Sequence, residues 1–272
     1  GGTNTREALA RIGHYYANIN TVYTGMPSSP IQLSCQQNFT LLATDGYWGD
    51  GVKTPTGKNL SGADIGNTDG TNNGYSTRAA AAYDANASSG SLADMAMYFF
   101  ANDLRPDLTN NVPAWNGVDA THQHMNLFAI GIGTTGTLNF ETGTLNFDSD
   151  LRNIISGAKN WPNPFTSTDQ ATRIDDLWHA TINARGQYYR AKDVSSLNSN
   201  LIQALQGITT QAGAGGGVGV AGNVLLDSQQ ILFSTKFQTG DWTGDLSAYR
   251  IDPNDGSVSS TAVWSAANEL LK

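Results

Sequence analysis

The sequence predicts an α/β domain with a mainly parallel sheet, followed by a shorter region of antiparallel β structure. Apolar strand-like segments alternate along the chain with segments whose apolar residues recur at helical spacing. The predicted strands cover 38–44, 125–133 and 186–192. The predicted helices cover 3–19, 91–104, 147–158, 172–184 and 193–212. Strands that alternate with helices pair in parallel, because each helix returns the chain to the same end of the sheet.

Periodicity and composition support the individual elements. The apolar face of the first predicted helix carries Leu9, Ile12, Tyr16 and Ile19. The apolar face of the helix 91–104 carries Leu92, Met95, Ala96 and Phe99. The strand 38–44 is apolar enough to be buried on both faces, as a parallel strand covered by helices would be.

Polar residues mark the predicted helix starts, because their side chains can accept from the free amides of the first turn. Ser91 is the predicted cap of the helix 91–104. The predicted caps of three other helices are Thr3 or Thr5, Asp148 or Ser149, and Asp193 or Ser195.

Two long loops are predicted to carry recognition, because loops on a rigid scaffold commonly do so. They cover about 46–90 and 104–122. The first is rich in Gly, Asn, Thr and Asp, and its residues Asp64, Asn67 and Asp69 could serve as oxygen ligands for calcium. The alternative is a turn-rich loop without a metal.

The pattern changes after residue 212. Residues 213–223 are Gly-rich and are predicted to form a flexible linker. Residues 231–260 show short alternating segments separated by turn residues, which is typical of antiparallel β structure.

Composition excludes several function classes. The chain has 272 residues, a formal net charge of −8 and 14% charged residues, and no basic cluster. Nucleic acid and anionic membrane are therefore not expected partners. No apolar run approaches the ~18 residues that would span a bilayer, so membrane insertion is not expected. The first residues do not resemble a signal peptide, and we expect the chain to be a segment of a longer protein.

The sequence carries no recognisable catalytic motif and is predicted not to be an enzyme. It lacks G-x-S-x-G, H-E-x-x-H and G-K-[ST]. The string GVGVAG at 217–222 follows a helix, so it is not a dinucleotide-binding turn. Asp175 and Asp176 are adjacent on a helix and are expected to point apart.

Asp45 stands where a predicted strand ends, at the edge of the sheet where α/β proteins bind ligands. Its carboxylate could orient a loop, cap a helix or bind a cation. Thr3 and Thr5 precede the first helix and could cap it or supply a hydroxyl ligand to a hard cation such as Mg²⁺. Tyr47 and Trp48 could form a contact platform or be buried under the insertion.

The remaining histidines and the cysteine are the last candidate residues. The imidazoles of 122–124 could bind a transition metal or serve packing and hydrogen bonding. His179 is predicted to be buried against Trp178. Cys35 is either a buried free thiol or one half of a disulfide whose partner lies outside this chain.

An ordered series of segments resembles the PilY family of type IV pilus tip adhesins and biogenesis factors of Gram-negative bacteria. The series is GGTNTREAL, CQQNFTLLATDGYW, LADMAMYFFANDLRPDL, THQHMNLFAIGIGTTGTL, RIDDLWHATINARGQYYRA and FSTKFQTGDWTGDLSAYRIDP. The resemblance implies that 1–212 is a von Willebrand factor A-like domain, a Rossmann-like doubly wound sheet that here lacks its first strand. It also implies that 224–272 begins a β-propeller, incomplete at its C-terminal end.

The resemblance further implies a metal-ion-dependent adhesion site. Such a site in this family uses a D-x-S-x-S loop, a Thr and an Asp, and by position Thr3 and Asp45 match the Thr and the Asp. Mg²⁺ or Ca²⁺ is the implied cofactor. The D-x-S-x-S segment is absent from this sequence, and the nearest string, at 245–249, lies in the second region and lacks the second Ser.

The function that the resemblance implies is adhesion and assembly at the tip of a type IV pilus, exported through the periplasm to the cell surface. The implied partners are minor pilins, a host or abiotic surface ligand, and the rest of the same polypeptide. The alternatives are a structural, force-bearing spacer without a metal and a secreted hydrolase.

Overall fold

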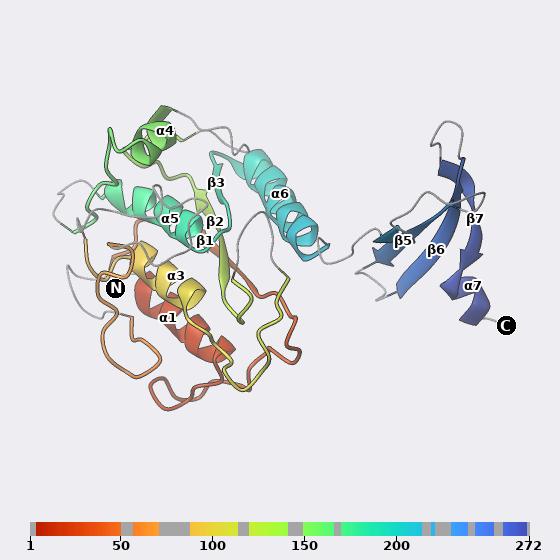
Figure 1. Cartoon of the computed structure of the whole chain (residues 1–272). Helices are drawn as coiled ribbons and strands as arrows, with labels where there is room; N and C mark the ends of the chain where they lie inside the picture. The colour runs from red at the N-terminus through yellow and green to blue at the C-terminus, as the bar shows by residue number, and fades with distance from the viewer. Residues whose placement is uncertain are drawn as a thin grey trace. The chain divides into compact units, whose positions relative to one another are not determined.

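The computed structural model describes residues 4–49, 57–70, 88–113, 120–140, 149–165, 170–213, 219–220, 230–238, 243–252 and 258–270. The chain forms two compact units, Gly1–Ile208 and Thr209–Lys272 (Figure 1). Each unit has its own sheet.

The first unit contains a three-stranded parallel sheet. Its strands are β1 (Phe39–Thr44), β2 (Asn126–Ile132) and β3 (Tyr188–Ala191), in the order β1-β2-β3. Phe39 stands opposite Asn126, and Ala129 stands opposite Tyr188. The prediction of an α/β unit with a parallel sheet is confirmed, and the arrangement is compatible with a Rossmann-like fold.

The predicted helices of this unit are present, with ends within a few residues of those expected. They are α1 (Thr5–Tyr16), α3 (Leu92–Ala101), α4 (Ser149–Ile155), α5 (Thr172–Asn183) and α6 (Val194–Gly213). In Figure 1, α1, α3 and α5 lie on one side of the strands and α6 lies on the other.

The alternation of side chains along β2 separates two apolar clusters. Leu127 and Ala129 join the larger cluster, which includes the apolar faces of α1, α3 and α5. Phe128 and Ile130 point to the opposite face and join a smaller cluster with Ala204 of α6. Helices therefore cover both faces of the sheet, because successive residues of a strand point to opposite sides.

The strand β1 differs from its prediction. It was expected to be buried on both faces, but only Thr40 is buried and Ala43 is exposed, whereas β2 is buried from Asn126 to Ile130 and beyond. The physical reason is position: within the described residues β1 pairs with β2 alone and stands at the edge of the sheet. The apolar strand β1 therefore lies at the edge of the sheet.

Two of the predicted caps are confirmed. Ser91 forms a capping box with Asp94, in which the Ser91 hydroxyl accepts from the Asp94 amide and the Asp94 carboxylate accepts from the Ser91 amide. At the start of α6, Asp193 Oδ1 accepts from the Ser196 amide at 2.7 Å, and Ser196 Oγ accepts from the Asp193 amide at 2.9 Å.

The predicted cap of α1 is wrong for Thr5. Thr5 is the first helical residue, and the N-cap position is occupied by Asn4, whose side chain makes no capping hydrogen bond. Thr3 lies outside the described residues. At α4 the helix begins at Ser149, and Asp148 lies outside the described residues.

The second unit is an antiparallel sheet, as the sequence predicts. Its strands are β4 (Gly219–Val220), β5 (Gln230–Gln238), β6 (Thr243–Ile251) and β7 (Val258–Ser265), followed by α7 (Ala266–Leu270). The segment 213–223 was predicted to be a flexible linker, but it contains the short strand β4. The backbone of β4 pairs with Phe233 and Leu232 of β5. Residues 214–218 and 221–223 lie outside the described residues.

The carboxylate of Asp245 holds together the end of this second sheet. It accepts from the hydroxyls of Ser247 and Ser265 and from the Ala267 amide at the start of α7. These three bonds lower the pKa of Asp245 below its usual value, with the Ala267 amide as the largest cause.

Across the described residues, no helix combines the length and the apolar character that a bilayer crossing requires.

The pairing of β2 with β3 leaves no room for a side chain at Gly186. A Cβ at Gly186 would overlap the backbone carbonyl of Leu127, which cannot move without displacing β2. We expect Gly186→Ala to lower the free energy of unfolding by about 3 kcal/mol, at the upper end of overpacking effects. Urea denaturation measures the change. Gly46→Ala is the matched control, since nothing lies within 4 Å of its Cβ position. A loss below about 1 kcal/mol for Gly186→Ala would show that the strands can separate locally.

Candidate functional site

The candidate site lies at the carboxyl edge of the parallel sheet, where β1 ends next to the start of α1. Asp45 follows β1 directly and is exposed. The turn after it is shaped by Thr44, whose hydroxyl donates to the Gly46 carbonyl at 2.9 Å and accepts from the Gly46 amide at 3.3 Å. The Asp45 carboxylate therefore stands on a short ordered turn at the sheet edge.

A groove of about 530 Å³ runs between α1 and β1. Its lining residues, which carry no charged side chain, are Asn4, Thr5, Ala8, Leu9 and Ile12, together with Thr40 to Thr44 of β1. Asn4, which follows Thr3 in the chain, and Thr44, which precedes Asp45, both line the groove. The predicted convergence of Thr3 and Asp45 remains a prediction, since Thr3 lies outside the described residues.

The described residues do not by themselves make a cation site at this edge. Mg²⁺ takes about six oxygen ligands, and Asp45 offers one carboxylate. Within the described ranges, no three His, Cys, Asp or Glu side chains are grouped so that they could hold a metal ion.

Two arginine side chains contact Trp48 in the segment that follows Asp45. Arg173 donates to the Trp48 carbonyl at 2.8 Å, and the guanidinium of Arg6 lies 4.9 Å from the centre of the Trp48 ring. Trp48 is buried, which confirms the burial alternative for this residue, whereas Tyr47 is 38% exposed. Of the two aromatic residues, only Tyr47 is available for contact with a partner.

The loop segment 57–70 is fixed to the helices by buried polar groups. The Asp94 carboxylate accepts from the Thr68 amide at 2.6 Å. Asp69 is fully buried, and its Oδ2 accepts from the Asn183 side chain at 2.7 Å and lies 3.5 Å from His179 Nε2. These contacts join the loop to both α3 and α5.

The two carboxylates of the predicted calcium loop, Asp64 and Asp69, lie in different surroundings. Asp64 is exposed and forms an ion pair with Lys58 at 2.6 Å, and Asp69 points into the interior toward α5. Asn67 lies between them and is partly buried. The carboxylates stabilise the loop through different partners, in agreement with the turn-rich alternative.

Asp175 and Asp176 point apart, as predicted, and each satisfies a different part of the backbone. Asp175 accepts from the Leu138 amide at 3.0 Å. Asp176 accepts from the Leu92 and Ala93 amides at 2.9 and 3.1 Å, and so caps the N-terminus of α3 from the neighbouring helix. Burial raises the pKa of Asp176 to about 7, and the two amide bonds offset part of that rise.

The histidines of 122–124 serve packing and hydrogen bonding. His122 Nε2 lies 2.9 Å from the Phe100 carbonyl, and His124 Nδ1 lies 2.8 Å from the His122 carbonyl. Burial lowers the pKa of His124 to about 4, so its imidazole is neutral at physiological pH. His179 is buried as predicted, but its ring stacks on Trp161 at 4.3 Å between centroids.

Cys35 is exposed and has a free thiol. The alternative of a buried thiol is therefore wrong, because the loop that carries Cys35 lies on the surface. The proposed disulfide to a cysteine outside this chain stays a prediction.

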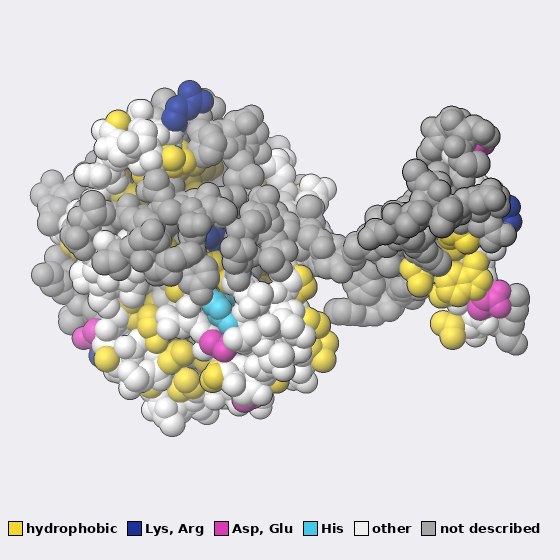
Figure 2. Space-filling model, viewed as in Figure 1, with side chains coloured by type: hydrophobic (Ala, Val, Ile, Leu, Met, Phe, Trp, Pro, Cys, Tyr) yellow, Lys and Arg dark blue, Asp and Glu magenta, His cyan; other side chains and the backbone are white. Residues whose placement is uncertain are grey.

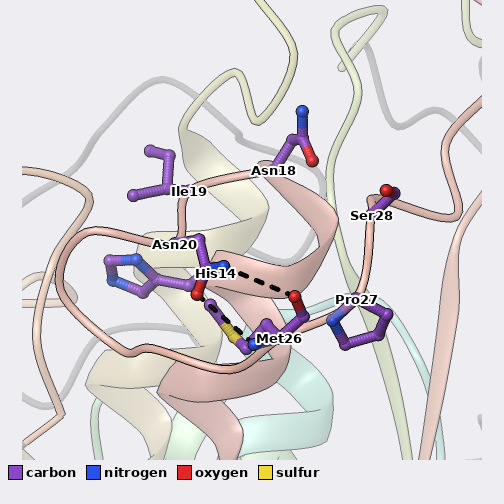
Figure 3. Close-up of a pocket in the computed structure, with 7 residues that line it drawn as sticks. All are labelled: His14, Asn18, Ile19, Asn20, Met26, Pro27 and Ser28. Carbon is purple, nitrogen blue, oxygen red and sulfur yellow. Dashed lines mark hydrogen bonds between the residues drawn. The ribbon is translucent and has the colours of Figure 1, made fainter.

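A second, smaller hollow of about 110 Å³ lies at the C-terminal end of α1 (Figure 3). It is lined by His14, Asn18, Ile19, Asn20, Met26, Pro27 and Ser28. The Asn20 side chain bonds to both backbone groups of Met26, which closes the loop across the hollow. Its size suits a few water molecules, so the groove beside β1 is the stronger candidate site.

Three curated relatives match this chain along nearly its whole length. Type IV pilus biogenesis factor PilY1 of Pseudomonas aeruginosa strain PAK is 28% identical over 302 residues, which cover 99% of this chain. PilY1 of strain UCBPP-PA14 is 29% identical over 303 residues, which cover 98% of this chain. PilY1 of strain PAO1 is 27% identical over 301 residues. The chain is thus similar to PilY1 along nearly its whole length.

The match covers only part of each relative. The PilY1-like chain spans about a quarter of the length of the curated relatives, 25% for strain PAK and 24% for strain UCBPP-PA14. No family model and no solved structure matches the chain. The von Willebrand factor A and propeller assignments therefore stay predictions.

Sequence reasoning missed the residues that build the groove and the buried caps. Ala8 and Ile12 of the PilY1-like chain line the groove, and Asp176 caps α3 across 84 positions of sequence. In the sequence, Ala8 and Ile12 are visible only as part of a helix with an apolar face, and Asp176 only as one of two adjacent helix carboxylates. Neither pattern indicates which distant segment the residue contacts.

The buried position of Asp176 makes the stability of the first unit depend on pH. Because its folded pKa lies above the ordinary aspartate value, Asp176 contributes stability at low pH that is lost as the pH rises through about 7. We expect the free energy of unfolding of the wild type, relative to Asp176→Asn, to fall by about 1 kcal/mol or more between pH 5 and pH 8. Denaturant titrations at both pH values measure the difference. A difference that does not change with pH would contradict this expectation.

Proposed function

We propose that this PilY1-like chain is a cell-surface module of a type IV pilus that serves pilus biogenesis and adhesion. The observation that carries the proposal is the match to PilY1 over 98–99% of the chain, through both compact units. Minor pilins at the pilus tip are the partners that this role implies. Export through the periplasm to the outer surface is the corresponding location.

We further propose that the carboxyl edge of the parallel sheet is the contact surface for a host or abiotic ligand. Asp45 and Tyr47 are exposed there, and the uncharged groove beside β1 adjoins them. Few charged side chains of the described residues appear on the face shown in Figure 2. Such a surface favours recognition by shape and hydrogen bonds over long-range charge attraction.

A structural, force-bearing spacer is the second candidate function. The missing D-x-S-x-S segment favours it, because its absence leaves a cation with fewer ligands. A hydrolase is the least favoured role. The buried carboxylates Asp94, Asp175 and Asp176 each accept from backbone amides, which is a structural use of these groups.

Deletion of the gene in its own bacterium tests the biogenesis role. We expect surface pili, counted by electron microscopy, and twitching motility to be lost, and the wild-type gene to restore both. Normal piliation in the deletion strain would contradict the role in biogenesis.

Complementation with Asp45→Ala tests the proposed adhesive edge. We expect piliation to be retained and attachment to epithelial cells or glass to fall by about tenfold, roughly 1.4 kcal/mol of binding free energy. Asp64→Ala is the matched control, since Asp64 is exposed but pairs with Lys58 away from the groove. Attachment that is unchanged in Asp45→Ala would favour the spacer.

Calorimetry with Mg²⁺, Mn²⁺ and Ca²⁺ tests the metal-ion-dependent adhesion site that the family resemblance implies. We expect the isolated chain to give no binding heat and no thermal shift at millimolar metal, because the described residues hold no group of three His, Cys, Asp or Glu side chains that could bind a metal ion. Saturable binding that Asp45→Ala abolishes would instead support a metal-assisted adhesion site.

A further inference from the structure

A group of polar side chains lies where β2 and β3 end, at the carboxyl edge of the sheet. Gly131 of β2 stands opposite Arg190 of β3 in the register of the two strands. Tyr188 is two positions before Arg190, so both side chains project from the same face of the sheet. That face is the one covered by α1, α3 and α5, because Tyr188 joins their apolar cluster.

Two hydroxyl groups approach the position that a side chain at Gly131 would take. A Cβ at Gly131 would overlap the Tyr188 hydroxyl and would lie 2.9 Å from Thr134 Oγ1. Tyr188 is only 2% exposed, and Thr134 is 7% exposed. The two residues are neighbours, but neither hydroxyl oxygen forms a hydrogen bond of acceptable geometry within the protein. A buried hydroxyl without a partner costs free energy, so a ligand that bonds to it is favoured.

Arg190 supplies a positive charge beside these hydroxyls. Burial raises the pKa of Tyr188, and the charge of Arg190 offsets part of that rise. Arg190 is partly buried, and its guanidinium makes no hydrogen bond and no ion pair with the described residues. The carboxylate of Asp175 also acts on Tyr188, but it accepts from the Thr137 and Leu138 amides and does not pair with Arg190. A guanidinium has only donors, so its partner must be an acceptor.

The loop that follows β2 adds backbone donors. Gly133 has a φ of 66°, and its amide donates to the Ala191 carbonyl at 2.7 Å, which ties the start of the loop to β3. The amides of the next three residues, 134–136, donate to no acceptor among the described residues. Successive amides in turns of this kind commonly form anion-binding concavities.

We propose that the carboxyl edge between β2 and β3 binds an oxyanion group, a carboxylate, sulfate or phosphate, through the Arg190 guanidinium and the Tyr188 and Thr134 hydroxyls. Each of these groups can donate a hydrogen bond, and a guanidinium matches two oxygens of such a group at once. Open α/β sheets bind ligands at this end of their strands. The site adjoins the edge that carries Asp45, since Thr44 stands opposite Gly131 on its other side, but it does not depend on the proposed role in the pilus.

Calorimetric and thermal-shift titrations of the chain with sodium phosphate, sodium sulfate and sodium acetate test the proposal. Sodium chloride at equal ionic strength is the reference, because salt also screens the net charge of −8. We expect saturable binding of at least one of the three anions, with a Kd of about 1–10 mM. Binding of acetate alone would assign the site to carboxylates, and binding of phosphate or sulfate would assign it to tetrahedral groups. Responses to all three anions that equal the response to chloride would overturn the proposal.

Removal of the arginine charge separates this site from general effects of salt. We expect Arg190→Met to weaken anion binding about tenfold or more. Arg250→Met is the matched control and is expected to bind as the wild type does, because Arg250 is exposed on β6 of the second unit. Circular dichroism checks that both variants fold. Binding that survives in Arg190→Met, or that falls equally in Arg250→Met, would refute the proposal.

Removal of the tyrosine hydroxyl distinguishes a ligand-binding role from a structural one. We expect Tyr188→Phe to weaken anion binding about fivefold, since one hydrogen bond to the anion is lost. Without the anion, its melting temperature is expected to be no lower than that of the wild type, because the hydroxyl has no hydrogen-bond partner in the protein. A variant that melts earlier and binds the anion with unchanged affinity would contradict the assignment of Tyr188 to the site.

Discussion

The structure of the first unit depends on the burial of β2 on both faces. Its side chains alternate between the cluster of α1, α3 and α5 and the smaller cluster of α6, so helices must lie on both sides of the sheet. The short parallel strands β1 and β3 extend this covered centre outward. The carboxyl ends of the three parallel strands meet at one edge, and the start of α1 lies beside the end of β1, since Asn4, Thr5 and Thr44 line one groove.

Burial on this scale encloses polar groups, and the unit satisfies them with carboxylates from distant parts of the chain. Asp176 caps α3 from α5, and Asp69 joins the loop 57–70 to α5. A buried carboxylate that accepts from backbone amides removes the cost of leaving those amides without partners. The loops beside the sheet edge are thereby fixed to rigid helices, which is the property that a contact surface needs.

The edge beside β1 is where fold and function meet. Its apolar strand, uncharged groove and exposed Asp45 combine features of an interior with those of a binding surface. The chain is similar to PilY1 along nearly its whole length, and this edge belongs to the matched region.

The sequence alone determined the elements and their class, because the apolar run of β2, the helical spacing in α3 and the caps Ser91 and Asp193 are local signals. Tertiary structure decided the rest. It set the edge position of β1, the exposure of Cys35, and the bond from Asp176 to an amide 84 positions away. The physical reason is that burial and hydrogen-bond partners depend on which segments meet in space, and local periodicity carries no information about segments far apart in the chain.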